Sequence, residues 1–320
     1  MLTLLCSGNV NAVVPDIRKP IPDNAVWYDL NSPTEEEIRH VEKATGICVP
    51  PRDQINRLGL SNRNRLGADA LHLHMALYAD GDRIPACSPL GLVLTQQILV
   101  TVRFAASKPV DSAPTAQGSR EGPDDGVDAF VTLLEAVTND IAEQMQEIAT
   151  DMAHLSTRVF IDARLNAQAL RSLIMDVGRL ERRLTRYRTS QLGMARILDF
   201  VDQRAPKWIE AAALLKLKIV HNDLRSLDKF DEQLTAKLQF LLDAILGFIN
   251  TDQNDIIRVL TVASVVTIPP VILAGIWGMN FRHMPDLVPV WAYPMALFSI
   301  GLSIIVPLLW FWKLGWLSKQ

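Results

Sequence analysis

Cysteine is scarce in this chain of 320 residues, which contains Cys6, Cys48 and Cys87 and no other. The three thiols are far apart and form no CxxC pair, which argues against a disulfide framework and against a zinc-ribbon site. A basic excess is also missing, because 32 Lys and Arg residues stand against 35 Asp and Glu residues. This balance argues against a general nucleic-acid-binding protein. The N-terminus lacks the basic start and long apolar run of a signal peptide, so we expect the bulk of the chain to stay in the cytosol.

Charged side chains are absent from two long stretches near the C-terminus. None stands between Arg258 and Arg282, and none between Asp286 and Lys313. Each stretch exceeds the roughly 20 apolar residues that cross a ~30 Å hydrocarbon core, so the sequence predicts two transmembrane helices. Prolines inside them do not oppose this prediction, because neighbouring helices in a membrane satisfy the freed carbonyl groups.

Two spans joined by a short loop place both chain ends on the same side of the membrane. Lys237 and Arg258 precede the first span, while Lys313 and Lys319 follow the second. The positive-inside rule assigns this side to the cytosol. We therefore expect a multi-pass protein of the plasma (inner) membrane with both termini in the cytosol.

The part of the chain before the spans predicts an α+β cytosolic domain followed by long helices. Residues 26–30 and 71–77 have strand patterns, and Thr34 before three glutamates is typical of a helix start. Residues 107–126 are rich in Pro, Gly, Ser and Asp and are predicted to be a linker. The expected order of parts is a cytosolic α/β domain (1–126), a helical hairpin (127–205), a stalk helix (206–258), the first transmembrane helix (259–281), an external loop (282–286), the second transmembrane helix (287–312) and a cytosolic tail (313–320).

The predicted stalk and first span form one helical pattern with no stop before Pro269. About 70 residues of helix would be roughly 100 Å long, which suits a rod that leads from a cytosolic domain into a bilayer. A cluster of arginines over residues 179–188 is interpreted as a solvated helix face.

Two helices cannot enclose an ion path, so a conducting protein of this kind has to be a homo-oligomer. The first span is the better lining candidate because it carries small and polar residues at helical spacing. These are Asn254, Thr261, Ser264, Thr267 and Gly275. Small residues also suit ordinary packing between transmembrane helices, so spacing alone leaves lining and packing open.

The tripeptide Gly278-Met279-Asn280 closes the first span and precedes the sequence MPDL at residues 284–287. This arrangement resembles the CorA family of divalent-cation channels, whose signature is a GMN tripeptide at this place. The resemblance is strong over the last 70 residues and looser over the whole chain. It implies a funnel-shaped homopentamer that lies in a lipid bilayer, has no enzymatic activity, and needs no cofactor besides the transported and regulatory Mg²⁺.

The resemblance also implies roles for individual residues. The outer selectivity filter falls on Gly278, Met279 and Asn280, and the external loop adds His283 and Asp286. The pore-lining positions of the family fall on Asn254, Leu260, Ile268 and Val271, to which Ser264 and Gly275 are added by their spacing. The regulatory Mg²⁺ that bridges subunits and holds the channel closed is assigned to Asp243 on the stalk and Asp53 in the α/β domain.

The chemistry of these residues fits a weakly bound, hydrated cation. Mg²⁺ gives up its waters reluctantly and prefers hard oxygen ligands. A ring of Asn280 amide oxygens accepts hydrogen bonds from the hydrated ion, and Leu260 and Ile268 provide apolar constrictions that close by dewetting. A divalent ion that crosses ~100 mV gains about 4.6 kcal/mol, so inward transport needs no ATP.

Two alternative functions stay open at this stage. Arg282 and His283 stand where many family members carry an acidic residue, which leaves the choice among Mg²⁺, Co²⁺, Ni²⁺ and Zn²⁺ unresolved. A ZntB-like zinc transporter, with or without proton coupling, is therefore one alternative, with His283 as a ligand. The other is a membrane-anchored sensor or enzyme that uses His72 and His74, on one strand face, as metal ligands.

Overall fold

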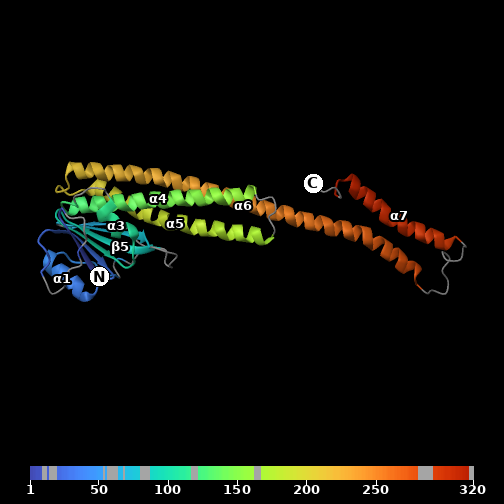
Figure 1. Cartoon of the computed structure of the whole chain (residues 1–320), viewed down its shortest axis with the longest axis horizontal. Helices are drawn as coiled ribbons and strands as arrows, with labels where there is room; N and C mark the ends of the chain where they lie inside the picture. The colour runs from blue at the N-terminus through green and yellow to red at the C-terminus, as the bar shows by residue number, and fades with distance from the viewer. Residues whose placement is uncertain are drawn as a thin grey trace. The chain divides into compact units, whose positions relative to one another are not determined.

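The computed structural model describes residues 1–8, 13, 20–52, 55, 64–67, 69–79, 87–116, 122–161, 167–279 and 291–316. The chain divides into two compact units (Figure 1). The first comprises Met1–Leu165 and Arg171–Leu242, and the second comprises Asn166–Leu170 and Asp243–Gln320. The first unit holds a β-sheet and long helices, and the second holds the apolar C-terminal helices.

The sheet has six strands in the order β1-β2-β6-β5-β4-β3. They are β1 (Leu2–Cys6), β2 (Ala25–Asn31), β3 (Arg65–Leu66), β4 (Leu71–Tyr78), β5 (Cys87–Leu94) and β6 (Leu99–Arg103). The pair β2–β6 is parallel, and the other neighbours are antiparallel. All of β6 is buried, as expected of a strand covered on both faces. The strands predicted over residues 26–30 and 71–77 are confirmed.

Helix α1 (Glu35–Thr45) begins where the sequence predicts. The Glu37 backbone N–H donates to Thr34 Oγ1 at 3.2 Å, and the Thr34 backbone N–H donates to Glu37 Oε2 at 2.8 Å. These two bonds form a capping box. Burial by itself raises the pKa of Glu37, but hydrogen bonds from Thr34, the N-terminal amine and Leu2 outweigh it and lower that pKa. Glu37 therefore ties the chain start to α1.

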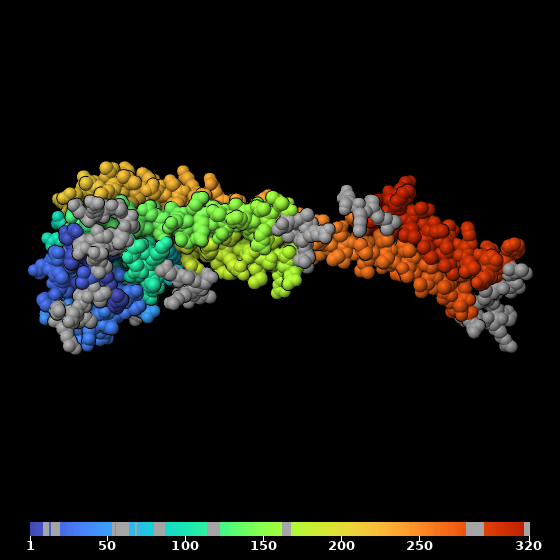
Figure 2. Space-filling view, viewed as in Figure 1, coloured from blue at the N-terminus to red at the C-terminus, as the bar shows by residue number. Residues whose placement is uncertain are grey.

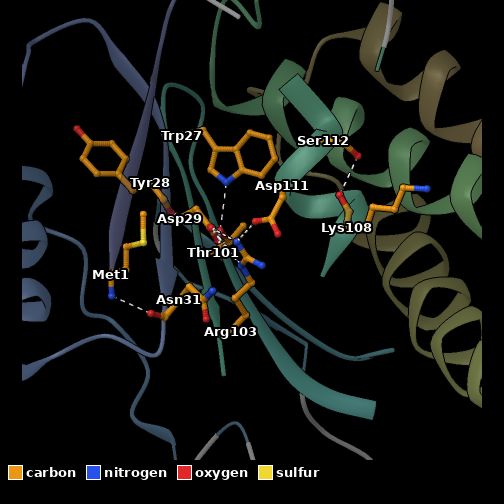
Figure 3. A network of polar contacts seen from close by, with 10 residues as sticks. All are labelled: Met1, Trp27, Tyr28, Asp29, Asn31, Thr101, Arg103, Lys108, Asp111 and Ser112. Carbon is orange, nitrogen blue, oxygen red and sulfur yellow. Dashed lines mark hydrogen bonds and ion pairs between the residues drawn. The ribbon is translucent and has the colours of Figure 1, made fainter. Parts of the chain in front are cut away.

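The predicted linker over 107–126 is wrong for its first part, because Lys108–Ala116 form helix α3. A buried polar network holds this helix against the parallel strand pair (Figure 3). Arg103 Nη2 donates to Asp29 Oδ2 at 2.7 Å and also pairs with Asp111 in the first turn of α3. This tertiary contact outweighs the poor helix propensity of the local sequence.

Arg103 remains charged although it is buried. Burial alone lowers the pKa of its guanidinium, but the carboxylates of Asp29 and Asp111 raise it above its usual value. Thr101 Oγ1 donates to Asp29 Oδ1 at 2.6 Å, and Trp27 Nε1 donates to Thr101 Oγ1 at 3.2 Å (Figure 3). The network therefore links β2, β6 and α3.

Three long helices follow, α4 (Gly126–Phe160), α5 (Ala167–Arg204) and α6 (Ala211–Trp277). A Cβ atom at Gly126 would lie 2.4 Å from the Ile98 backbone nitrogen, so the close approach of α4 to the sheet requires glycine there. Lys216 pairs with Asp128 at 3.0 Å, and Phe240 stacks on Phe160 with ring centroids 5.8 Å apart. The first part of α6 therefore runs in the same direction as α4 (Figure 1).

The predicted stalk and first span are one continuous helix, α6, which contains Pro269 and Pro270. From Leu246 to Trp277 none of its side chains is buried. In α7 (Ala292–Lys313), Phe311 is the one buried side chain among the described residues. Both helices are long and apolar enough to cross a membrane. Figure 2 shows the atoms of α7 next to those of the later part of α6.

The arginine cluster of α5 joins helices and is not merely solvated, which corrects the sequence interpretation. Arg183 pairs with Asp151 of α4 at 2.6 Å and with Glu147 at 2.9 Å. Arg188 pairs with Asp231 of α6 and donates to Thr235 Oγ1 at 2.9 Å. Two arginines of the cluster therefore fix α5 to its neighbours.

The Asp231 carboxylate is fully buried, with 0% of its surface exposed. Burial raises its pKa, and the Arg188 guanidinium opposes that shift. Oδ1 has no hydrogen-bond partner among the described residues, so Arg188 supplies most of the compensation for the buried charge.

We predict that Arg188→Ala destabilises the protein by about 2 kcal/mol. Breaking a fully buried ion pair costs roughly 3–5 kcal/mol, and the effect is smaller here because Arg188 is 40% exposed. Thermal unfolding of the purified full chain measures this loss. Arg182→Ala is the matched control, since Arg182 is exposed on the same helix and has no ion pair with any described residue. Equal unfolding temperatures for the two variants would contradict the assigned role.

Candidate ion path and gating residues

One line of residues runs along the exposed side of α6 at alternating spacings of four and three. We call it the α6 stripe. It consists of Asp243, Gly247, Asn250, Asn254, Ile257, Thr261, Ser264, Ile268, Val271, Gly275 and Gly278. This spacing keeps neighbouring members on one side of a helix, but a drift of about 20° in every seven residues places Asp243 and Gly278 about 100° apart. No member of the stripe is buried within its own chain.

The chemical character of the stripe changes along its length. Its first third presents the exposed polar side chains Asp243, Asn250 and Asn254. Thr261 and Ser264 then carry hydroxyl groups into the apolar run, and the Thr261 hydroxyl donates to the Ile257 carbonyl oxygen at 2.8 Å. Apolar side chains and glycines complete the line. Polar residues within a membrane-spanning helix face protein or water far more often than lipid.

The structure brings most of the predicted lining residues onto this single stripe. Asn254, Ser264, Ile268, Val271 and Gly275 are all members. Leu260 is 66% exposed and borders the stripe, about 40° around the helix from Ser264.

Gly247, Asn250 and Ile257 belong to the stripe but were missed in the sequence interpretation. The sequence signal is the same spacing, which continues upstream of the apolar run into the stalk. Gly247 and Gly275 both have open space around the position of a Cβ atom, so nothing in the chain itself demands glycine there.

Helix α6 ends at the predicted filter. The Gly278 N–H donates to the Ala274 carbonyl oxygen at 2.9 Å, and the Met279 N–H donates to the Ile276 carbonyl oxygen at 3.3 Å. A Cβ atom at Gly278 would lie 3.0 Å from the Ala274 oxygen, which is a tight contact. Glycine therefore suits this helix end. Asn280, His283 and Asp286 lie outside the described residues.

The two carboxylates assigned to regulation have different outcomes. Asp243 lies on α6, is exposed and is the first member of the stripe. Asp53 lies outside the described residues. Within the described part of a single chain, no group of three or more His, Cys, Asp or Glu side chains could hold a metal ion.

His72 and His74, the ligands of the enzyme or sensor alternative, lie half-buried on β4. Burial first, and the neighbouring Arg65 second, lower the pKa of His72. The backbone N–H of His74 donates to Asn64 Oδ1 at 3.2 Å. Neither histidine belongs to a metal-binding group of described residues.

Comparison with known proteins agrees with this architecture. Residues 22–314 match the family model described as "CorA-like Mg2+ transporter protein". The magnesium transport protein CorA of Escherichia coli (strain K12) is 28% identical over 303 residues, which cover 92% of each chain.

Two solved structures share the fold at low sequence identity. The complete CorA magnesium transporter of Methanocaldococcus jannaschii is 16% identical, with a TM-score of 0.77 over 99% of both chains. The cytoplasmic domain of ZntB from Vibrio parahaemolyticus is 13% identical, with a TM-score of 0.53 over 79% of this chain and 100% of that chain. The fold predicted from the sequence, an α+β domain with a long helix and two candidate spans, is confirmed. Since the family match takes in the sheet, the long helices and both apolar helices, the chain belongs to the CorA-like Mg²⁺ transporter family.

Proposed function

We propose that this protein is a channel for Mg²⁺ influx, assembled from five copies of the chain around a pore lined by the α6 stripes. Membership of this transporter family makes the chain a divalent-cation transporter and not an enzyme. The observation that carries the finer proposal is the α6 stripe itself. It is exposed, contains polar and small residues, and continues through a membrane span to the GMN tripeptide.

The exposure of α6 supports an oligomeric pore. The apolar side chains of Ile272 and Leu273 are stable in contact with lipid. The polar side chains of Asn254 and Ser264 are not. When the stripes of several subunits face a common pore axis, their polar groups contact water and ions, and the apolar flanks of α6 contact α7 and lipid. The number five comes from the family resemblance and is part of the proposal.

Mg²⁺ is the favoured ion for two reasons. The first is that the tripeptide Gly278-Met279-Asn280 and the following MPDL sequence are intact. The second is that the E. coli relative, which aligns with 92% of the chain at 28% identity, is named a magnesium transport protein. A ring of asparagine oxygens suits a hydrated Mg²⁺ ion that is not stripped of its waters.

Zn²⁺ transport in the manner of ZntB is the second candidate. The observation in its favour is His283 in the external loop, a ligand type that suits Zn²⁺ better than Mg²⁺. The shared fold does not favour either ion, because the cytoplasmic domain of ZntB matches at 13% identity only.

The proposed orientation has the sheet, the stalk and the C-terminal tail in the cytosol, in a plasma or inner membrane. In this orientation Asp243 faces cytosolic Mg²⁺ before the ion path enters the membrane. Several Asp243 carboxylates around one axis would repel one another, and bound Mg²⁺ would relieve that repulsion and hold the subunits together. The release of Mg²⁺ at low cytosolic concentration would then loosen the closed state. The partner carboxylate proposed for this site is Asp53.

We predict that Asn280→Ala abolishes Mg²⁺ uptake while the protein still assembles. The substitution removes the ring of amide oxygens at the proposed pore mouth. Uptake into vesicles that contain the purified protein is measured with a fluorescent Mg²⁺ indicator, with and without competing Zn²⁺ and Co²⁺ and with and without a proton gradient.

Asn222→Ala is the control for this experiment, because Asn222 lies exposed on α6 far before the span. Undiminished uptake by Asn280→Ala would refute the pore-mouth assignment. Uptake of Zn²⁺ in preference to Mg²⁺, driven by a proton gradient, would favour the ZntB-like alternative.

We predict that Asp243→Ala raises Mg²⁺ uptake at high internal Mg²⁺, because the variant lacks the carboxylate proposed to hold the closed state. Vesicles preloaded with increasing Mg²⁺ measure the inhibition. Asp252→Ala is the matched control, since Asp252 is exposed about 180° around the helix from Asp243. An unchanged inhibition curve for Asp243→Ala, or an equal shift in both variants, would count against this role.

A further inference from the structure

A tight turn follows α7 and folds the chain back on the helix end. Gly315 adopts φ +74°, a left-handed conformation that favours glycine. The Trp316 N–H donates to the Phe311 carbonyl oxygen at 3.0 Å, and the Gly315 N–H donates to the Trp312 carbonyl oxygen at 3.0 Å. This arrangement is typical of a Schellman-type helix end. As a result Trp316 stacks on Phe311, with ring centroids 5.3 Å apart.

Trp316 also contacts the first span. The Arg258 guanidinium carbon lies 5.5 Å from the Trp316 ring centroid, within the range of a cation–π interaction. Arg258 is the last charged residue before the uncharged run of α6, and its Nη1 lies 3.6 Å from Asp255 Oδ1. Phe311, at the other side of this chain of contacts, is 4% exposed. Arg258, Trp316 and Phe311 therefore connect the start of one span with the end of the other, and we call them the span clasp.

The clasp borders the stripe. Arg258 is about 40° around the helix from Asn254 and about 60° from Thr261. A helix that is held at Arg258 cannot rotate freely about its own axis, so the contact constrains the direction in which Ser264 and its neighbours face. Trp and Arg are both favoured at the membrane surface, where these ends of the two spans meet.

We infer that the span clasp sets the rotation of the pore-lining helix, which makes Arg258 and Trp316 positioning residues for the ion path. The consequence for transport rests on the proposed channel function, whereas the contact itself does not. The competing explanation is that Arg258 and Trp316 each anchor their own helix in the membrane surface without acting on one another. Coupling between the two substitutions distinguishes these explanations.

The test is a double-mutant cycle in the full-length protein. Arg258→Gln, Trp316→Ala and the combined variant are compared by initial Mg²⁺ uptake into vesicles and by thermal unfolding of the solubilised protein. We expect each single substitution to lower uptake about three- to five-fold. The double variant should take up Mg²⁺ no more slowly than the slower of the two single variants. Trp316→Phe and Arg258→Lys, which keep the ring and the cation, should restore most of the uptake.

Trp312→Ala is the matched control, because Trp312 is 67% exposed at the same helix end and has no ring contact with described residues. The inference is overturned if the two single effects multiply in the double variant, or if Trp312→Ala is as harmful as Trp316→Ala. If the parent protein takes up no Mg²⁺, the proposed channel function fails separately. The unfolding temperatures then test the clasp alone. Coupled effects of the two substitutions on these temperatures would support the clasp, and additive effects would contradict it.

Discussion

From Leu246 to Trp277, helix α6 buries none of its side chains within its own chain, and this exposed surface determines which surroundings the protein needs. Apolar surface of this extent is not stable in water, so the segment requires a membrane, other protein chains or both. In the proposed channel, the stripe with Asn254 and Ser264 faces an aqueous axis, and the flanks of the helix contact lipid and α7. The proposal of assembly around an axis therefore rests on how polar groups are distributed on one helix.

The cytosolic unit holds its part of α6 by different means. The ion pair with Arg188 offsets the cost of burying the Asp231 carboxylate, and it fixes the contact between α6 and α5. A second buried ion pair joins the parallel strands to α3 (Figure 3). Here the buried guanidinium of Arg103 pairs with the carboxylates of Asp29 and Asp111. Such pairs add little net stability, since each buried charge loses its hydration, but the loss of one partner leaves the other charge buried and unpaired. In the second unit, the cation–π contact between Arg258 and Trp316 connects α6 with the end of α7.

The sequence predicted those parts of the fold that depend on local patterns. Thr34 with Glu37, the strand at 26–30 and the two uncharged runs are signals within a few consecutive residues. Helix α3 was missed because its stability comes from Arg103 in the sheet, which no local pattern shows. Spacing indicated Asn254, Thr261, Ser264 and Gly275 of the stripe but not Gly247, Asn250 and Ile257, which precede the uncharged run that begins after Arg258. The filter residue Asn280 and the regulatory Asp53 came from resemblance and remain predictions, as both lie outside the described residues.

Access of water to the α6 stripe shows whether this side of the helix lines an aqueous path. Cysteine is introduced separately at Ser264, on the stripe, and at Val266, about 160° around the helix, in a variant without the native cysteines. Reconstituted vesicles are then treated with a charged, membrane-impermeant thiol reagent, and Mg²⁺ uptake is measured. We expect the reagent to stop uptake through Ser264→Cys and to leave Val266→Cys active. Equal inhibition of both variants, or inhibition of Val266→Cys alone, would contradict it.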